Sequence, residues 1–68
     1  MLKDWNHDLI HQLSEVSDSL WRMENYKKAA AGCPHCQALW RKLEEEYEGH
    51  VKLITQEIKR HVAENRFD

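Results

Sequence analysis

The chain has 68 residues and a mass of 8.2 kDa, enough for a single domain spanning residues 1–68. So short a chain usually needs a metal, a disulfide or a second chain to be stable, and we expect no enzyme with a deep pocket of its own. Its formal net charge of −2 supplies no basic field for nucleic acid. No apolar run is long enough to span a membrane, and the first residues lack the apolar core of a signal peptide. We therefore expect a cytoplasmic protein.

Both halves of the chain carry apolar residues at the spacing of an α-helix. A single proline and two glycines leave little turn chemistry for a β fold. Intervals of three and four residues describe one face of a helix in each half. The two stripes are Leu2, Trp5, Leu9, Leu13, Val16, Leu20 and Met23, and then Trp40, Leu43, Tyr47, Val51, Ile54, Ile58 and Val62. The sequence therefore predicts an all-α protein of two helices.

The first helix is predicted to cover residues 4–31. Asp4 is a residue type that commonly serves as N-cap, and Gly32 suits the position just after a helix. The serine-rich segment 14–19 favours caps over helix interiors and would give three helices if the first helix broke there. The apolar stripe continues in phase through this segment, which favours one unbroken helix.

The second helix is predicted to cover residues 35–66, after a tight turn at 32–36. Cys33 suits the N-cap and Pro34 the first helical position, where a missing N–H costs nothing. Gly49 lies inside this helix, opposite the stripe. It is either an exposed defect or a point of close approach by another backbone.

An antiparallel hairpin of two helices buries too little surface to be stable by itself. Ile10 and Trp21 lie off the main stripe of the first helix and widen its apolar arc beyond what one neighbouring helix covers. We therefore expect a homodimer, either a four-helix bundle of two hairpins side by side or an end-to-end pair joined at the turns. Ile10 and Trp21 are the candidate dimer-interface residues.

The turn contains the sequence Cys33-Pro34-His35-Cys36, whose two thiols can point at one centre. A helix N-terminus favours the thiolate form, as do the nearby cations Lys27, Lys28, Arg41 and Lys42. Structural Zn²⁺ takes four ligands, of which one such pair supplies two. A second copy of the chain can supply the other two. The sequence therefore predicts Cys33 and Cys36 as zinc ligands in a homodimer, with His35 outside the ligand set.

Residues 27–36, with the sequence Lys-Lys-Ala-Ala-Ala-Gly-Cys-Pro-His-Cys, resemble the zinc-hook apex of the coiled-coil ATPases of DNA double-strand-break repair. In that family a Cys-Pro-x-Cys turn caps an antiparallel helical hairpin, and two turns share one zinc ion. The resemblance implies metal binding by Cys33 and Cys36 and an end-to-end homodimer. It concerns the apex alone, since Gln37 stands where that family commonly has glycine and no nucleotide-binding halves are present.

Two other interpretations of the cysteine pair remain open. Cys-Pro-His-Cys is also the active tetrapeptide of thioredoxin-fold disulfide oxidants, in which Cys33 would attack and Cys36 would resolve. No βαβ unit surrounds the motif here, so this alternative is a redox-responsive dithiol protein without that fold. The third interpretation is a metal-free helical module that binds a protein partner and whose thiols are inert.

The histidines offer a weaker metal hypothesis. His7 and His11 stand four residues apart, a spacing that can chelate a metal from one helix face. His61 and Glu57 would complete a cluster of four only if the first helix rotated substantially. A solvated face is the favoured interpretation of His7 and His11.

Overall fold

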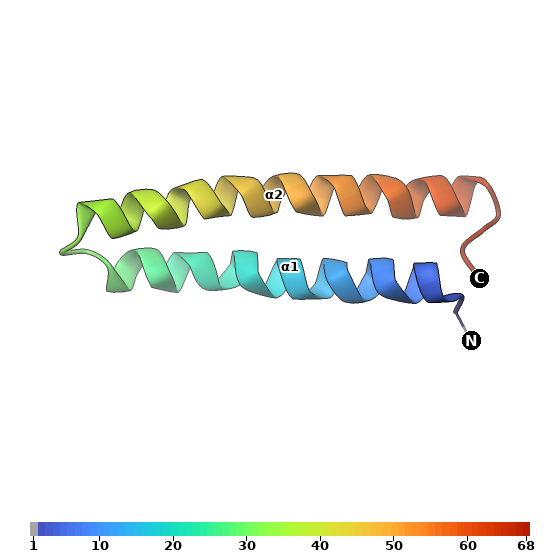
Figure 1. The fold of residues 1–68 in the computed structure, drawn as a ribbon, viewed down its shortest axis with the longest axis horizontal. Helices are drawn as coiled ribbons and strands as arrows, with labels where there is room; N and C mark the ends of the chain where they lie inside the picture. Colours follow the sequence, from blue (N-terminus) through green and yellow to red (C-terminus); the bar gives the residue numbers. More distant parts are fainter. Residues whose placement is uncertain (1) are drawn as a thin grey trace.

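A computed structural model of the protein describes residues 2–68 as two helices, α1 (Asp4–Ala29) and α2 (Pro34–Ala63). The helices run antiparallel and pack along their length (Figure 1), and the backbone measures about 50 × 18 × 12 Å. Residues 2–68 contain no β-strand. The predicted all-α hairpin is therefore confirmed. Neither helix carries an apolar stretch that would cross a membrane.

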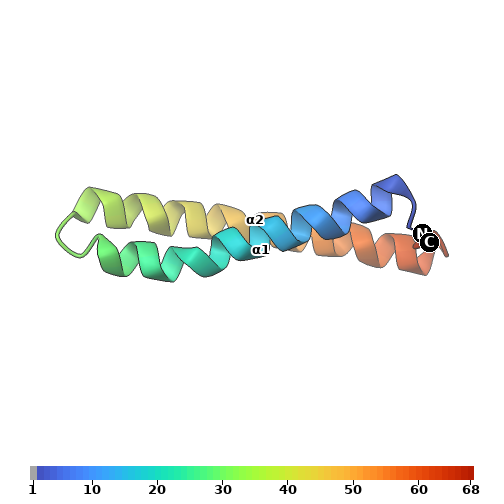
Figure 2. The same ribbon diagram turned by 90° about the horizontal axis from the view of Figure 1, so that it is seen from below.

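The seam between the helices follows a seven-residue repeat. Its residues on α1, all buried or half-buried, are Asn6, Leu9, Leu13, Val16, Leu20, Met23 and Lys27. Those on α2 are Gln37, Trp40, Glu44, Tyr47, Val51, Ile54, Ile58 and His61. A seven-residue repeat keeps two helices in contact only if they wind around each other, and Figure 2 shows α1 and α2 crossing near their middle.

Winding changes which residues at the start of α1 face its partner. The prediction from a straight helix placed Trp5 on the core stripe, whereas the structure leaves Trp5 half-exposed and buries Asn6 completely. Asn6 stands one repeat before Leu13, and this repeat follows the supercoiled seam. Among the described residues, only Val16 and Met23 are buried apolar side chains.

α1 begins at residue 4, as predicted, but its N-cap is Lys3 and not Asp4. Lys3 is the N-cap and makes no capping hydrogen bond through its side chain, while Asp4 is the first helical residue. There the Asp4 carboxylate lies in the first turn, where it interacts favourably with the helix dipole. The helix continues without a break through Ser14–Ser19, as the apolar stripe predicted.

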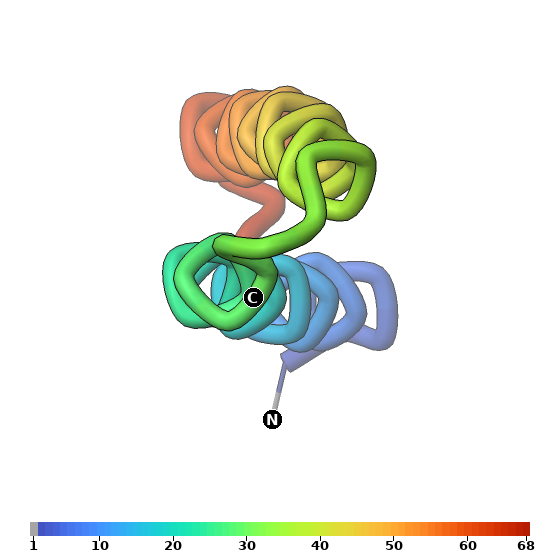
Figure 3. The backbone as a smooth tube through the Cα atoms, turned by 90° about the vertical axis from the view of Figure 1, so that its left-hand side faces the viewer, coloured from blue at the N-terminus to red at the C-terminus, as the bar shows by residue number. Residues whose placement is uncertain are grey.

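α1 ends at Ala29, two residues before the predicted end. Ala30 is the C-cap, and its N–H donates to the Tyr26 carbonyl at 3.1 Å. Gly32 has a negative φ, so it does not provide the left-handed cap expected of it. The physical reason is that the chain reverses direction before Pro34. Residues 30–33 therefore lie outside both helices and carry the chain across from α1 to α2, as Figure 3 shows from the apex.

α2 ends at Ala63 rather than at residue 66. Asn65 adopts a left-handed φ of 56°, and its N–H donates to the Val62 carbonyl at 3.1 Å. The N–H of Arg66 donates to the His61 carbonyl at 2.7 Å. This pair of bonds is the Schellman motif, which closes a helix by satisfying carbonyls of its last turn.

The two ends of the described chain meet at the far end of the hairpin from the turn (Figure 1). After Asn65 the chain folds back over the start of α1. The Lys3 N–H donates to the Asp68 carbonyl at 2.6 Å. The hairpin thus has an apex at residues 30–33 and an open end where residues 2–6 and 64–68 lie together.

Candidate functional site

Cys33 and Cys36 converge at the apex. Cys33 is the N-cap of α2, as predicted, and its Sγ accepts a hydrogen bond from the Cys36 N–H at 3.2 Å. Pro34 occupies the first helical position, so the chain enters the helix between the two cysteines. Their Cα atoms are 5.3 Å apart, and the two sulfurs lie within bonding distance of each other as a disulfide.

A shallow apolar groove of about 340 Å³ lies beside the two sulfurs. Its walls are Ala29 and Ala30 at the end of α1, together with the rings of Tyr26 and Trp40. The two rings pack with their centroids 4.9 Å apart. The sulfurs therefore open onto an aromatic surface on one side of the hairpin.

Lys27 braces the helices just below the apex. Its Nζ forms ion pairs with Glu44 of α2 at 3.1 Å and with Glu24 at 3.2 Å. The hydrogen bonds that Lys27 donates to Glu44 and then to Glu24 raise the pKa of Lys27 above its ordinary value of 10.5. The Gln37 side chain also donates to the Lys27 carbonyl at 3.2 Å. The ammonium group of Lys27 is thus paired with two glutamates rather than with the sulfurs.

One chain brings two ligands to the apex, Cys33 and Cys36. No group of three or more His, Cys, Asp or Glu side chains gathers as a metal site among residues 2–68. His7 and His11 have exposed side chains on α1, and the structure does not bring them together with His61.

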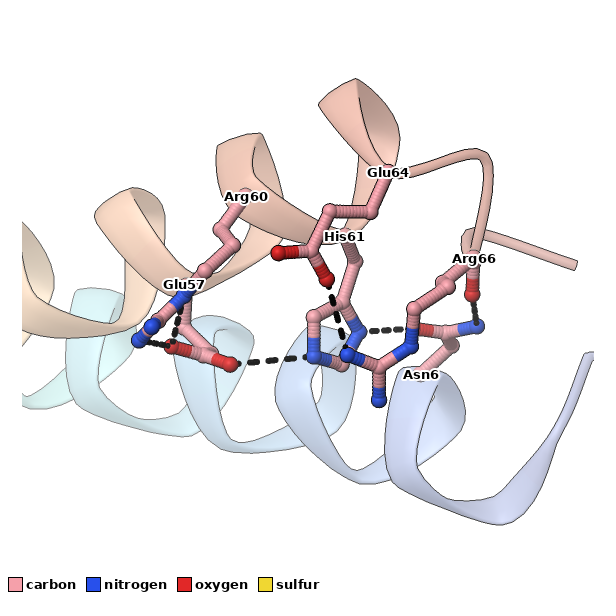
Figure 4. Close-up of polar contacts among 6 residues, drawn as sticks. All are labelled: Asn6, Glu57, Arg60, His61, Glu64 and Arg66. Carbon is pink, nitrogen blue, oxygen red and sulfur yellow. Dashed lines mark hydrogen bonds and ion pairs between the residues drawn. The ribbon is translucent and has the colours of Figure 1, made fainter.

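His61 instead belongs to a buried polar chain at the open end, shown in Figure 4. Its Nδ1 lies 2.7 Å from Asn6 Oδ1, and its Nε2 lies 3.0 Å from Glu57 Oε2. Glu57 also accepts hydrogen bonds from Arg60. The hydrogen bonds from Arg60 and, to a lesser degree, from His61 hold the pKa of Glu57 below its ordinary value of 4.5.

The amide of Asn6 joins this chain to residues beyond α2. Its Nδ2 donates to the carbonyls of Arg66 and Asp68, at 2.7 and 3.1 Å. Since Nδ2 is used in this way, Oδ1 faces His61, and His61 Nδ1 must be the donor between them. Asn6 was not among the predicted site residues, because in a straight helix it lies off the apolar stripe. The signal that could have found it is its place one repeat before Leu13.

The predicted interface residues Ile10 and Trp21 are both exposed on α1, at 42% and 77%. They stand eleven residues apart, about three helical turns, and so share one face of the helix. That face points away from the groove beside the cysteines, which α1 lines with Tyr26, Ala29 and Ala30. Ile10 and Trp21 are thus available to a partner but separate from the apex.

Comparison with family models, with curated protein sequences and with solved structures found no match to this chain.

Proposed function

We propose that this protein is a zinc-dependent homodimerisation module, in which Cys33 and Cys36 of two copies hold one Zn²⁺ ion at the apex. The observation that carries the proposal is the convergence of two sulfurs at the N-terminus of α2. Zinc requires four ligands in a structural site, and each chain brings two. Joined in this way, two hairpins form one assembly whose role is to bring protein chains together, without catalysis.

The local chemistry supports this assignment. Four thiolates around Zn²⁺ leave a formal charge of −2, which nearby helix N-termini stabilise. In each chain both sulfurs lie at the start of α2, and the Cys36 N–H already donates to the Cys33 sulfur. The groove formed by Tyr26 and Trp40 supplies apolar surface beside the site for a second chain to cover.

Native mass spectrometry of reduced protein purified without chelator tests the proposal. We expect a dimer carrying one zinc ion, which dissociates when a chelator removes the metal. The double variant Cys33→Ser/Cys36→Ser should lose the zinc, and serine still caps the helix. His35→Ala is the matched control and should keep zinc and dimer, because His35 lies outside the ligand set. A wild-type protein without bound zinc would contradict the proposal.

A second candidate function is suggested by the pairing of Cys33 with Cys36 at the apex. In this alternative the pair is a reversible redox switch. Cys33 and Cys36 give up two electrons and two protons to a small disulfide such as oxidised glutathione, which is reduced to two thiols. Thiol alkylation followed by mass measurement, across a series of glutathione ratios, tests it. A pair that remains reduced at every ratio would exclude the switch.

A further inference from the structure

All the grooves described on the hairpin open on one side of it. The apex groove and a groove of about 400 Å³ near the open end are lined by residues that stand 21 positions apart, which is three seven-residue repeats. One such pair on α1 is Tyr26 of the apex groove and Trp5 of the open-end groove. On α2, Cys36 corresponds in this way to Glu57, and Trp40 to His61. Because the seam follows the same repeat, both grooves lie on the same flank of the hairpin.

A third groove of about 170 Å³ joins this flank, since Gln12 and Ile54 line both it and the open-end groove. We call the flank that carries all three the groove face. At the positions that repeat Trp5, α1 contributes the uncharged side chains of Trp5, Gln12, Ser19 and Tyr26, while Asp8 adds a carboxylate to the open-end groove.

Large apolar side chains of α2 project along the groove face. Leu53 lines the third groove and is 66% exposed. Leu39 stands two repeats before Leu53, so it occupies the same position nearer the apex, and it is 51% exposed. Together with the half-exposed Trp5, these residues place apolar side chains at intervals from the apex to the open end, with the carboxylates of Glu46 and Glu57 between them.

The area of the molecule indicates what covers this surface. The accessible surface of residues 1–68 is 5279 Å². A folded monomer of this mass is expected to expose about 4,500 Å². The excess of about 700–800 Å² matches the roughly 800 Å² that each partner buries in a protein–protein interface of standard size. A second copy of the chain fits an interface of this size and also supplies the two further sulfurs that the proposed zinc site needs.

We infer that two copies pack side by side and parallel through the groove face, so that both apexes lie at the same end of a four-helix bundle. This inference rests on the proposed zinc site and names the surface that completes it. Cys33 and Cys36 line the apex end of this face. A parallel pairing brings four sulfurs to one place, whereas an antiparallel pairing separates the two pairs by nearly the 50 Å length of the hairpin.

The parallel bundle differs from an end-to-end dimer in the position of the open ends. In the bundle the two open ends are neighbours, whereas in an end-to-end dimer they lie about twice the 50 Å length of the hairpin apart. Energy transfer between a donor and an acceptor dye, attached to the α-amino groups of two populations of the chain, distinguishes the two. We expect strong transfer in reduced protein with one zinc per dimer.

Two substitutions test which face of the hairpin forms the dimer interface. Leu53→Glu places a charge on the groove face, and we expect it to raise the dimer dissociation constant about tenfold or more and to weaken zinc binding. Trp21→Glu is the matched control on the other face of α1 and should leave both unchanged. Both side chains are exposed in the single hairpin, so circular dichroism should show the helical content of each variant unchanged.

The outcomes separate this inference from the function on which it rests. A zinc-bound dimer without energy transfer, or one that tolerates Leu53→Glu, overturns the parallel bundle and leaves the zinc site in place. A zinc-bound dimer that Trp21→Glu disrupts and Leu53→Glu does not moves the interface to the face of Ile10 and Trp21, and also overturns the inference. A wild-type chain that forms no zinc-bound dimer removes the proposed function and the inference with it.

Discussion

Asn6 fastens the open end of the hairpin through three hydrogen bonds made by one fully buried side chain. Its amide nitrogen serves two backbone carbonyls, and its oxygen serves His61. Every buried polar side-chain atom among the described residues has a partner, so the burial of an amide between two helices is compensated. Because no apolar residue could serve these partners, asparagine at this position specifies how the ends of the chain meet α1.

Replacement of Asn6 by alanine should therefore destabilise the protein more than the small loss of side-chain volume suggests. Asn6→Ala leaves the His61 Nδ1–H and two carbonyls without their partner, and we expect a loss of about 1–3 kcal/mol in the free energy of unfolding. Urea denaturation followed by circular dichroism measures it. Asn25→Ala, on the exposed surface of α1, is the matched control and should change stability by less than about 0.5 kcal/mol. Equal effects of the two substitutions would contradict the role given to Asn6.

Glu57 gives the open end a dependence on acid. Its pKa is lowered in the folded chain by the hydrogen bonds from Arg60 and His61. A carboxylate of this kind contributes stability that is fully present above its unfolded pKa and is lost as the pH falls through its folded pKa. We expect the melting temperature of the wild type to approach that of Glu57→Gln as the pH is lowered from neutral to below 4.5. A constant difference across this range would show that Glu57 makes no such contribution.

The helices and where they begin could largely be predicted from the sequence, whereas their C-terminal ends could not. The spacing of apolar residues predicted both helices and the unbroken passage through Ser14–Ser19, because hydrophobic periodicity reports directly on the buried face. The ends depend on backbone groups that find partners elsewhere. Asn65 closes α2 through a left-handed φ, and the chain at residues 30–33 reverses without help from Gly32.

Gly49 provides a test of what stabilises α2. It lies inside α2 on an exposed surface, and a Cβ atom built there would meet nothing within 4 Å. Gly49→Ala should therefore stabilise the protein by up to about 1 kcal/mol, because alanine loses less backbone entropy in a helix. Thermal unfolding followed by circular dichroism measures the change. A destabilised variant would indicate that another chain approaches the backbone at this position.

At the scale of the whole molecule, the sequence predicted where the thiols converge but not the surface around them. Cys33 as N-cap and Pro34 as first helical residue follow from local rules of helix capping. The groove face does not, since it depends on how α1 and α2 wind around each other along their length. The spacing of apolar residues predicted Ile10 and Trp21 as interface residues, which stays a prediction. The seven-residue repeat gathers the grooves on the other side, with Trp5, Tyr26 and Leu53.

A dimer joined by zinc should show its stability to depend on both metal and chain concentration. A ligand or partner that binds only the folded state raises the melting temperature by mass action. We expect the melting temperature of the reduced wild type to rise with added zinc and with protein concentration. The double variant Cys33→Ser/Cys36→Ser should lose the response to zinc. A zinc-induced rise of equal size in that variant would place the metal away from the cysteines.

The contacts that hold the beginning of α1 come from the opposite end of the chain. Lys3 and Asn6 are fastened by the carbonyls of Arg66 and Asp68, although some sixty residues separate them in sequence. During synthesis α1 is therefore made before the residues that fasten its first turn. It can pack against α2 as that helix emerges from the ribosome, but its hydrogen bonds to the carbonyls of Arg66 and Asp68 form only once residues 66–68 have emerged as well.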